Sequence, residues 1–130
     1  METLTTFIPA EGKATVEGKN VSRFIRQLAK VAGVSERTLA QAVTMAESQL
    51  SRMAANKKGA VRAQTLYPLR RVALLVEEAG KTLSEPGVKE WLSTPNPYLD
   101  DVPPILHVRS DKELEKALSV LASIRHGFPA

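Results

Sequence analysis

Two groups of side chains in this 130-residue sequence have types and spacings that could recognise a partner. Glutamine and arginine can read adenine and guanine edges through paired hydrogen bonds, and lysines just beyond them can contact phosphate. The first group has this composition and consists of Ser48, Gln49, Ser51, Arg52, Lys57 and Lys58. It predicts a DNA-reading helix followed by a basic loop.

The second group is the run Trp91-Leu92-Ser93-Thr94-Pro95-Asn96-Pro97-Tyr98-Leu99. An aromatic residue on a helix is followed by two prolines that stiffen the next loop. A rigid edge of this kind loses little entropy on binding, which suits a protein partner. The alternative is that Trp91 anchors the core of a small domain and the prolines shape its loop, and the residues alone fit that alternative better.

Side chains that could perform catalysis are not grouped in a usable way. The sequence has no nucleophile-elbow, glycine-rich phosphate-loop or zinc-protease signature, and it has no cysteine. The pairs Glu77-Glu78 and Asp100-Asp101 are adjacent in sequence, and neighbours on a helix do not face each other. The two histidines, His107 and His126, are far apart, and His126 fits the end of a helix. We therefore expect neither an enzyme nor a bound metal or cofactor.

Charge divides the chain into a basic and an acidic part. Residues 1–75 carry 12 lysines and arginines against 5 carboxylates, and residues 76–130 carry 6 against 9. The net charges of +7 and −3 indicate two surfaces with different partners, and the basic one could attract a phosphate backbone. No run of 18 apolar residues is present, and the N-terminus does not resemble a signal peptide, so the expected location is cytoplasmic.

Apolar periodicity predicts an all-α fold of about six helices. Residues 1–19 read as a poorly ordered arm with room for a short strand. A first helix ends at Gly33, and Ser35 caps the next. A longer helix covers residues 63–80, is closed by Gly80, and starts nearer Leu66 or Tyr67 because of Pro68. A short helix opens at Ser84, and the capping box Ser110–Glu113 starts a last helix that Gly127 ends. Outside the arm, the only candidate for a strand is the short segment of residues 105–108.

Two helix-turn-helix registers are open. In the first, Gly33 forms the turn and the helix after Ser35 reads DNA. In the second, the turn is Thr44-Met45-Ala46, and residues 47–55 form the reading helix with Leu50 buried. The first register has the better turn, since glycine tolerates positive φ, whereas the second has the better reading face. Operators of such proteins usually have two half-sites, which predicts a homodimer. One apolar face is wider than a small domain needs, and we expect part of it to form the dimer interface: the face around Leu66, Leu69, Val72, Ala73 and Val76.

The second half of the chain resembles the toxin-binding domain of the Xre/MbcA/ParS antitoxins. The resemblance rests on the run from Trp91 to Leu99, on Pro103-Pro104-Ile105, on the capped last helix, and on the ending Ile124-Arg125-His126-Gly127-Phe128-Pro129-Ala130. It covers residues 63–130. Residues 20–62 resemble, less specifically, the Xre-type helix-turn-helix domain of this family, in the second register. This gives three parts: an arm (1–19), a helix-turn-helix domain (20–62) and a toxin-binding domain (63–130).

The resemblance implies a type II antitoxin. Such a protein dimerises, blocks the active site of a RES-domain toxin that depletes NAD, and represses its own operon. It implies toxin contacts at Trp91, Pro95, Asn96, Pro97, Leu99, Gly127, Phe128, Pro129 and Ala130. Two departures stand out: the turn Thr44-Met45-Ala46 lacks the usual glycine, and Asp100-Asp101 stand where the family often has glycine.

Two other functions remain open. One is a stand-alone transcriptional regulator whose C-terminal domain only dimerises, and the other is a small helical adaptor without DNA binding. A RES-type toxin in the neighbouring reading frame would favour the antitoxin.

Overall fold

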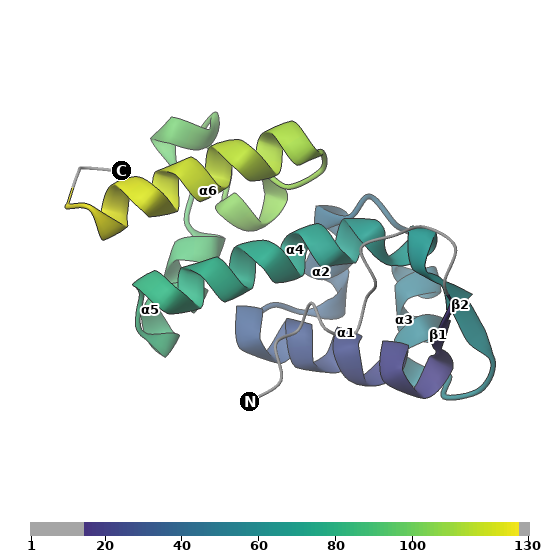
Figure 1. Ribbon diagram of the computed structural model, residues 1–130. Coiled ribbons are helices and arrows are strands. Elements are labelled where there is room, and N and C mark those ends of the chain that lie inside the picture. Colours follow the sequence, from purple (N-terminus) through teal and green to yellow (C-terminus); the bar gives the residue numbers. More distant parts are fainter. Residues whose placement is uncertain (1–14, 128–130) are drawn as a thin grey trace.

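The computed structural model describes residues 15–127, which form six α-helices, two short 3-10 helices and a two-stranded sheet (Figure 1). The predicted all-α class is confirmed. The α-helices are α1 (Gly18–Ala32), α2 (Glu36–Ala42), α3 (Glu47–Ala55), α4 (Ala63–Thr82), α5 (Glu85–Ser93) and α6 (Asp111–Arg125). The 3-10 helices η2 (Pro97–Leu99) and η3 (Pro104–Leu106) connect α5 to α6.

The small sheet ties the start of α1 to the start of α4. Strands β1 (Thr15–Glu17) and β2 (Ala60–Arg62) pair antiparallel, with Val16 opposite Val61. The Gly18 amide donates to the Gly59 carbonyl at 2.8 Å, and a side chain at Gly18 would clash with the Lys58 carbonyl. Strands of three residues are too short to show alternation, so β2 was not predicted. The strand candidate at 105–108 is wrong, because its first two residues belong to η3.

The helix ends follow the predicted local signals. Ser35, Ser84 and Ser110 each accept a hydrogen bond from the backbone amide three residues later, at 3.1, 3.2 and 3.1 Å. The last of these caps differs from the reciprocal capping box in one respect. The Glu113 carboxylate accepts from the Arg109 amide at 2.9 Å, one residue before the cap.

Helix α4 is longer at both ends than predicted. It begins at Ala63, with Pro68 inside its second turn. The missing proline N–H removes a single helical bond, to the carbonyl of the exposed Gln64, which water can satisfy. At the other end α4 continues through Gly80 to Thr82. Gly80 lies on the exposed side, so the helix loses only the weaker propensity of glycine there.

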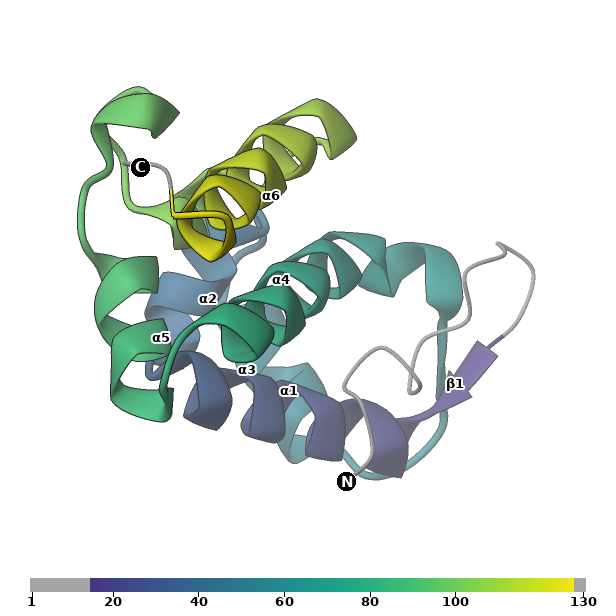
Figure 2. The ribbon, with the colours of Figure 1, turned by 60° about the vertical axis from the view of Figure 1, so that its left-hand side comes forward.

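The core lies on both sides of α4, which runs between α1 and α6 (Figures 1 and 2). One cluster of buried apolar side chains extends from β1 to α6 and crosses the boundary predicted at residues 62–63. It includes every residue of the α4 face that was assigned to a dimer interface: Leu66, Leu69, Val72, Ala73 and Val76. That assignment is wrong, since helices of the same chain cover this face. Among residues 15–127, no helix has the length and apolar character needed to cross a membrane.

Candidate DNA-binding and partner-binding surfaces

Both predicted helix-turn-helix turns are present, and they have the same backbone design. After α1, the Val34 amide bonds to the Ala29 carbonyl, and Gly33 has a positive φ of 71°. After α2, the Met45 amide bonds to the Ala40 carbonyl, and Thr44 takes the left-handed position with φ 51°. Each turn is a Schellman motif, in which glycine usually takes this position. The turn without glycine therefore has the geometry that glycine would give.

Helix α3 is held against the molecule by one face only. Leu50 and Ala54 are buried, and the buried Ser22 hydroxyl of α1 donates to the Ala54 carbonyl near the end of α3. Ser48, Gln49 and Arg52 are exposed. Ser51 is half-buried and donates to the Glu36 carboxylate at 3.0 Å, so its hydroxyl is engaged within the protein.

Four of the six residues predicted to contact DNA line two separate hollows, and Ser48 and Ser51 line neither. Gln49, Arg52 and Lys58 line a depression of about 440 Å³ between α3 and residues 56–61. Lys58 is oriented by a 2.9 Å bond from its amide to the Asn56 side chain. Lys57 instead lines a separate groove beside α1. The structure thus brings together three of the six predicted DNA contacts.

The loop after α5 is organised around Asn96. Its side chain accepts from the Tyr98 amide at 2.9 Å, and its backbone pairs with Val102. Asn96 and Leu99 are buried, whereas Pro95 and Pro97 are exposed. Leu99 therefore shapes the loop from within and offers no surface in this conformation.

Tyr98 is the exposed aromatic residue that the sequence analysis missed at this loop. Its side chain is 51% exposed, and it is one of two large apolar residues with this property among residues 15–127. Trp91 is half-buried against the core, and its indole nitrogen is buried without a hydrogen-bond partner in the described chain. Pro97 starts η2, and within this short helix Leu99 is buried while Tyr98 is exposed, which no local sequence signal indicates.

Asp100 and Asp101 continue the loop in the left-handed region, with φ of 58° and 61°. These are the positions where the resembled family often has glycine, and aspartate tolerates this backbone better than most residues. The loop is anchored by His107, which is 5% exposed. Its Nε2 lies 3.3 Å from the Asp100 carboxylate and its Nδ1 lies 3.1 Å from the Glu113 carbonyl.

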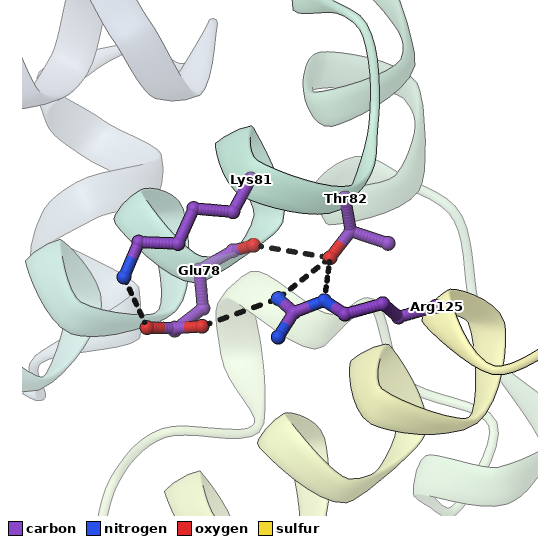
Figure 3. Close-up of polar contacts among 4 residues, drawn as sticks. All are labelled: Glu78, Lys81, Thr82 and Arg125. Atoms are coloured by element: carbon purple, nitrogen blue, oxygen red, sulfur yellow. Dashed lines mark hydrogen bonds and ion pairs between the residues drawn. The ribbon is translucent and has the colours of Figure 1, made fainter.

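The C-terminal end of α6 is fixed to α4 by a polar cluster (Figure 3). The Arg125 guanidinium donates to the Thr82 hydroxyl at 2.9 Å and to the Glu78 carboxylate at 3.3 Å. Lys81 donates to the other oxygen of Glu78 at 2.9 Å. The Lys81 hydrogen bond, helped by Arg125, holds the pKa of Glu78 below its usual range, against a smaller opposite effect of burial.

This cluster fixes the point from which the tail departs. Helix α6 ends at Arg125, with His126 as its C-cap. Gly127, the predicted helix stop, follows them; it is exposed and has a positive φ of 80°. The predicted tail contacts Phe128, Pro129 and Ala130 lie outside the described residues. Among residues 15–127, no cluster of three histidine or carboxylate side chains could hold a metal ion.

Known proteins were compared with this chain at the levels of sequence and structure. No family model and no curated protein sequence matches it. A chain in the crystal structure of the M. tuberculosis MbcT–MbcA toxin–antitoxin complex is similar in structure, with a TM-score of 0.63 and 16% sequence identity. The match covers 84% of this chain and 96% of that chain. At this identity, the similarity shows a shared fold.

Proposed function

We propose that this chain is the antitoxin of a type II toxin–antitoxin pair. The observation that carries the proposal is the fold shared with a chain of the MbcT–MbcA complex over 84% of the residues. The run from Trp91 to Leu99 adds support, because it carries the sequence resemblance and has Pro97 and Tyr98 exposed at the surface. The partner would be a RES-domain toxin that depletes NAD, as the sequence resemblance implies.

The toxin would be held by two neighbouring parts of the C-terminal half. The first is the loop with the exposed residues Pro95, Pro97 and Tyr98. The buried Asn96 and Leu99 and the half-buried Trp91 hold this loop against the core. The second is the tail from Gly127 onward, which follows the point where Arg125 bonds to Thr82 and Glu78. An apolar tail that enters the toxin's active site would inhibit it without chemistry by the antitoxin.

Operator binding is the second part of the proposal. A Schellman turn at Thr44 joins α2 to α3, and α3 presents Gln49 and Arg52 with Lys58 beside them, which supports this part of the proposal. A homodimer reading two half-sites would serve as autorepressor. The dimer interface must lie elsewhere than the apolar face of α4.

The test is co-expression with the protein of the neighbouring reading frame, followed by co-purification. We expect a stable complex, and NAD that falls when the neighbour is expressed alone and recovers when both are present. Tyr98→Ala should weaken the complex, whereas Ser119→Ala, an exposed change on α6, should not. If no complex forms and the chain binds the upstream DNA specifically, the stand-alone regulator is favoured. The exposed polar face of α3 is the observation that supports this second candidate.

A further inference from the structure

A groove of about 830 Å³ lies between α1, the end of α4 and the start of α5. Figure 2 shows these three helices meeting near the end of α1. Apolar side chains line part of it: Val31, Val76, Leu83 and Val88. Val31 is 38% exposed and, with Tyr98, is one of the two exposed large apolar residues in the described chain. Val76 and Val88 are buried at its base, whereas Val31 and the half-buried Leu83 form a small apolar strip that no segment within residues 15–127 covers.

Positive charge surrounds this strip. The cations that line the groove are Lys19, Arg23, Arg26, Lys30, Lys57 and Lys89, and the carboxylate among its lining residues is Glu85. Lys19 pairs with Glu17 at 3.5 Å, on the surface. Within residues 15–127, the other five cations have no carboxylate at ion-pair distance.

Four of the cations form a line along α1. Lys19, Arg23, Arg26 and Lys30 are spaced by four, three and four residues, which places them on one face of a helix. At 1.5 Å per residue the line is about 16 Å long. Lys89 faces the far end of α1, where its alkyl chain packs against Gly33 and a side chain at Gly33 would displace it.

We propose that this groove binds an acidic amphipathic helix of a partner protein. Carboxylates spaced by four, three and four residues on such a helix would meet the four cations of α1. Apolar residues beside those carboxylates would cover Val31 and Leu83. Binding of an amphipathic helix in a groove is a common mode of peptide recognition, and the charges would set the position of the docked helix along α1.

Two other occupants fit the groove less well. A DNA backbone would meet the cations but would leave the apolar strip without a partner. A second copy of this chain lacks the matching face, since no described helix carries carboxylates at this spacing. The groove also shares no lining residue with the Gln49–Arg52–Lys58 hollow or with the residues proposed to touch the toxin. The inference therefore does not depend on the proposed function.

The experiment uses the full chain and a fluorescent helical peptide. The peptide carries glutamates at the spacing of the four α1 cations and leucines beside them, and anisotropy measures its affinity. Arg26→Glu should weaken binding by about tenfold or more, because it places like charges opposite each other. Lys112→Glu, the same reversal on an exposed site of α6, should leave the affinity unchanged.

Two further variants separate docking from general attraction. The peptide's glutamate that would face Arg26 is then changed to lysine. This changed peptide should bind the Arg26→Glu protein more tightly than the original peptide binds that protein. Gly80→Leu should fill the groove, since space beyond Gly80 is open, and should abolish binding. Its melting temperature should not fall, because leucine favours the helix more than glycine does.

Several results would overturn the proposal. A peptide of the same composition with scrambled order could bind as tightly as the designed one, or Lys112→Glu could weaken binding as much as Arg26→Glu. Either result would mean attraction to any polyanion. If Arg26→Glu left peptide binding unchanged and instead weakened duplex DNA binding, the groove would be a DNA-facing surface. If it instead changed the mass of the protein in light scattering, the groove would be an interface between copies.

Discussion

Arg52 is the side chain on which DNA reading by α3 should depend most. It is exposed, lies one helical turn from Gln49, and shares a hollow with Lys58. If its guanidinium reaches a guanine edge, Arg52→Ala should cost about 1–3 kcal/mol of binding and relax specificity at one base pair. Lys58→Ala should weaken binding to all sequences and lower the salt slope by about one. Gel-shift titrations on the upstream region at several salt concentrations measure both.

The competing register has its own diagnostic residue. Arg37 is exposed on α2, the helix that would read DNA if Gly33 formed the functional turn. Unchanged binding by Arg52→Ala with a loss in Arg37→Ala would assign the reading role to α2. Ser51→Ala is a matched control on α3, because the Ser51 hydroxyl is already bonded to Glu36.

Thr44 carries backbone strain in the turn between α2 and α3. A β-branched residue at φ 51° is in a region that costs about 1 kcal/mol or more, and glycine removes that cost. We expect Thr44→Gly to raise the free energy of unfolding by about 1 kcal/mol, less the entropy that glycine adds to the unfolded chain. Thermal or urea unfolding measures the change. A Thr44→Gly protein less stable than Thr44→Ala would show that the Thr44 side chain stabilises the turn.

The difference between Leu99 and Tyr98 shows how far single residues can be read from sequence. Both lie in the run from Trp91 to Leu99, and the sequence resemblance implied Leu99 as a contact. The structure buries Leu99 and exposes Tyr98. Which side chain of a short 3-10 helix points inward depends on the core it meets, and no local pattern of three residues contains that information.

At the scale of elements, the parts that depend on local chemistry were predictable. The three serine caps and the stop at Gly33 involve bonds over a few residues, so the local sequence is enough to indicate them. The strand β2 and the true limits of α4 depend on contacts with distant segments. Pro68 and Gly80 are local helix breakers, but packing of α4 on both sides outweighs their cost.

The joint between α4 and α6 should respond to acid. Because Lys81 and Arg125 lower the folded pKa of Glu78, ionised Glu78 favours the folded state. That stability is present above the unfolded pKa and is lost as the pH falls through the lower folded pKa. Glu78→Gln should therefore lower the free energy of unfolding at pH 7, by at most about 1 kcal/mol for a cluster this exposed. At a pH below the folded pKa of Glu78 the variant and the parent should converge.

Urea unfolding at both pH values provides the measurement. Glu90→Gln is the control, since Glu90 is an exposed carboxylate on α5. It should show no comparable difference between the two pH values. A Glu78→Gln deficit that stayed constant down to low pH would mean that the side chain stabilises the joint through packing and not through charge.

At the scale of the whole molecule, the charge counts predict a basic and an acidic surface, and they do not resolve the two hollows within the basic half. The basic first half contains the Gln49–Arg52–Lys58 hollow, and it also contains most of the cations of the α1 groove. Sequence counts cannot separate these two surfaces, because neighbouring lysines such as Lys57 and Lys58 line different hollows. Their division follows from how the loop after α3 crosses the start of α1.

The tail should decide toxin inhibition without contributing to the fold. Helix α6 ends at Arg125, whose guanidinium bonds to Thr82 and Glu78 of α4, and the exposed Gly127 follows two residues later. A chain ending at His126 keeps that joint and the whole buried core, so its melting temperature and DNA affinity should match those of the full chain. It should lose most of its affinity for the toxin, because the apolar residues that would enter the active site are gone. Co-purification, NAD measurements and growth of cells expressing the toxin test this. If the shortened chain protects cells as well as the full one, the inhibitory contact must instead be made by the loop around Tyr98 and the face of α6.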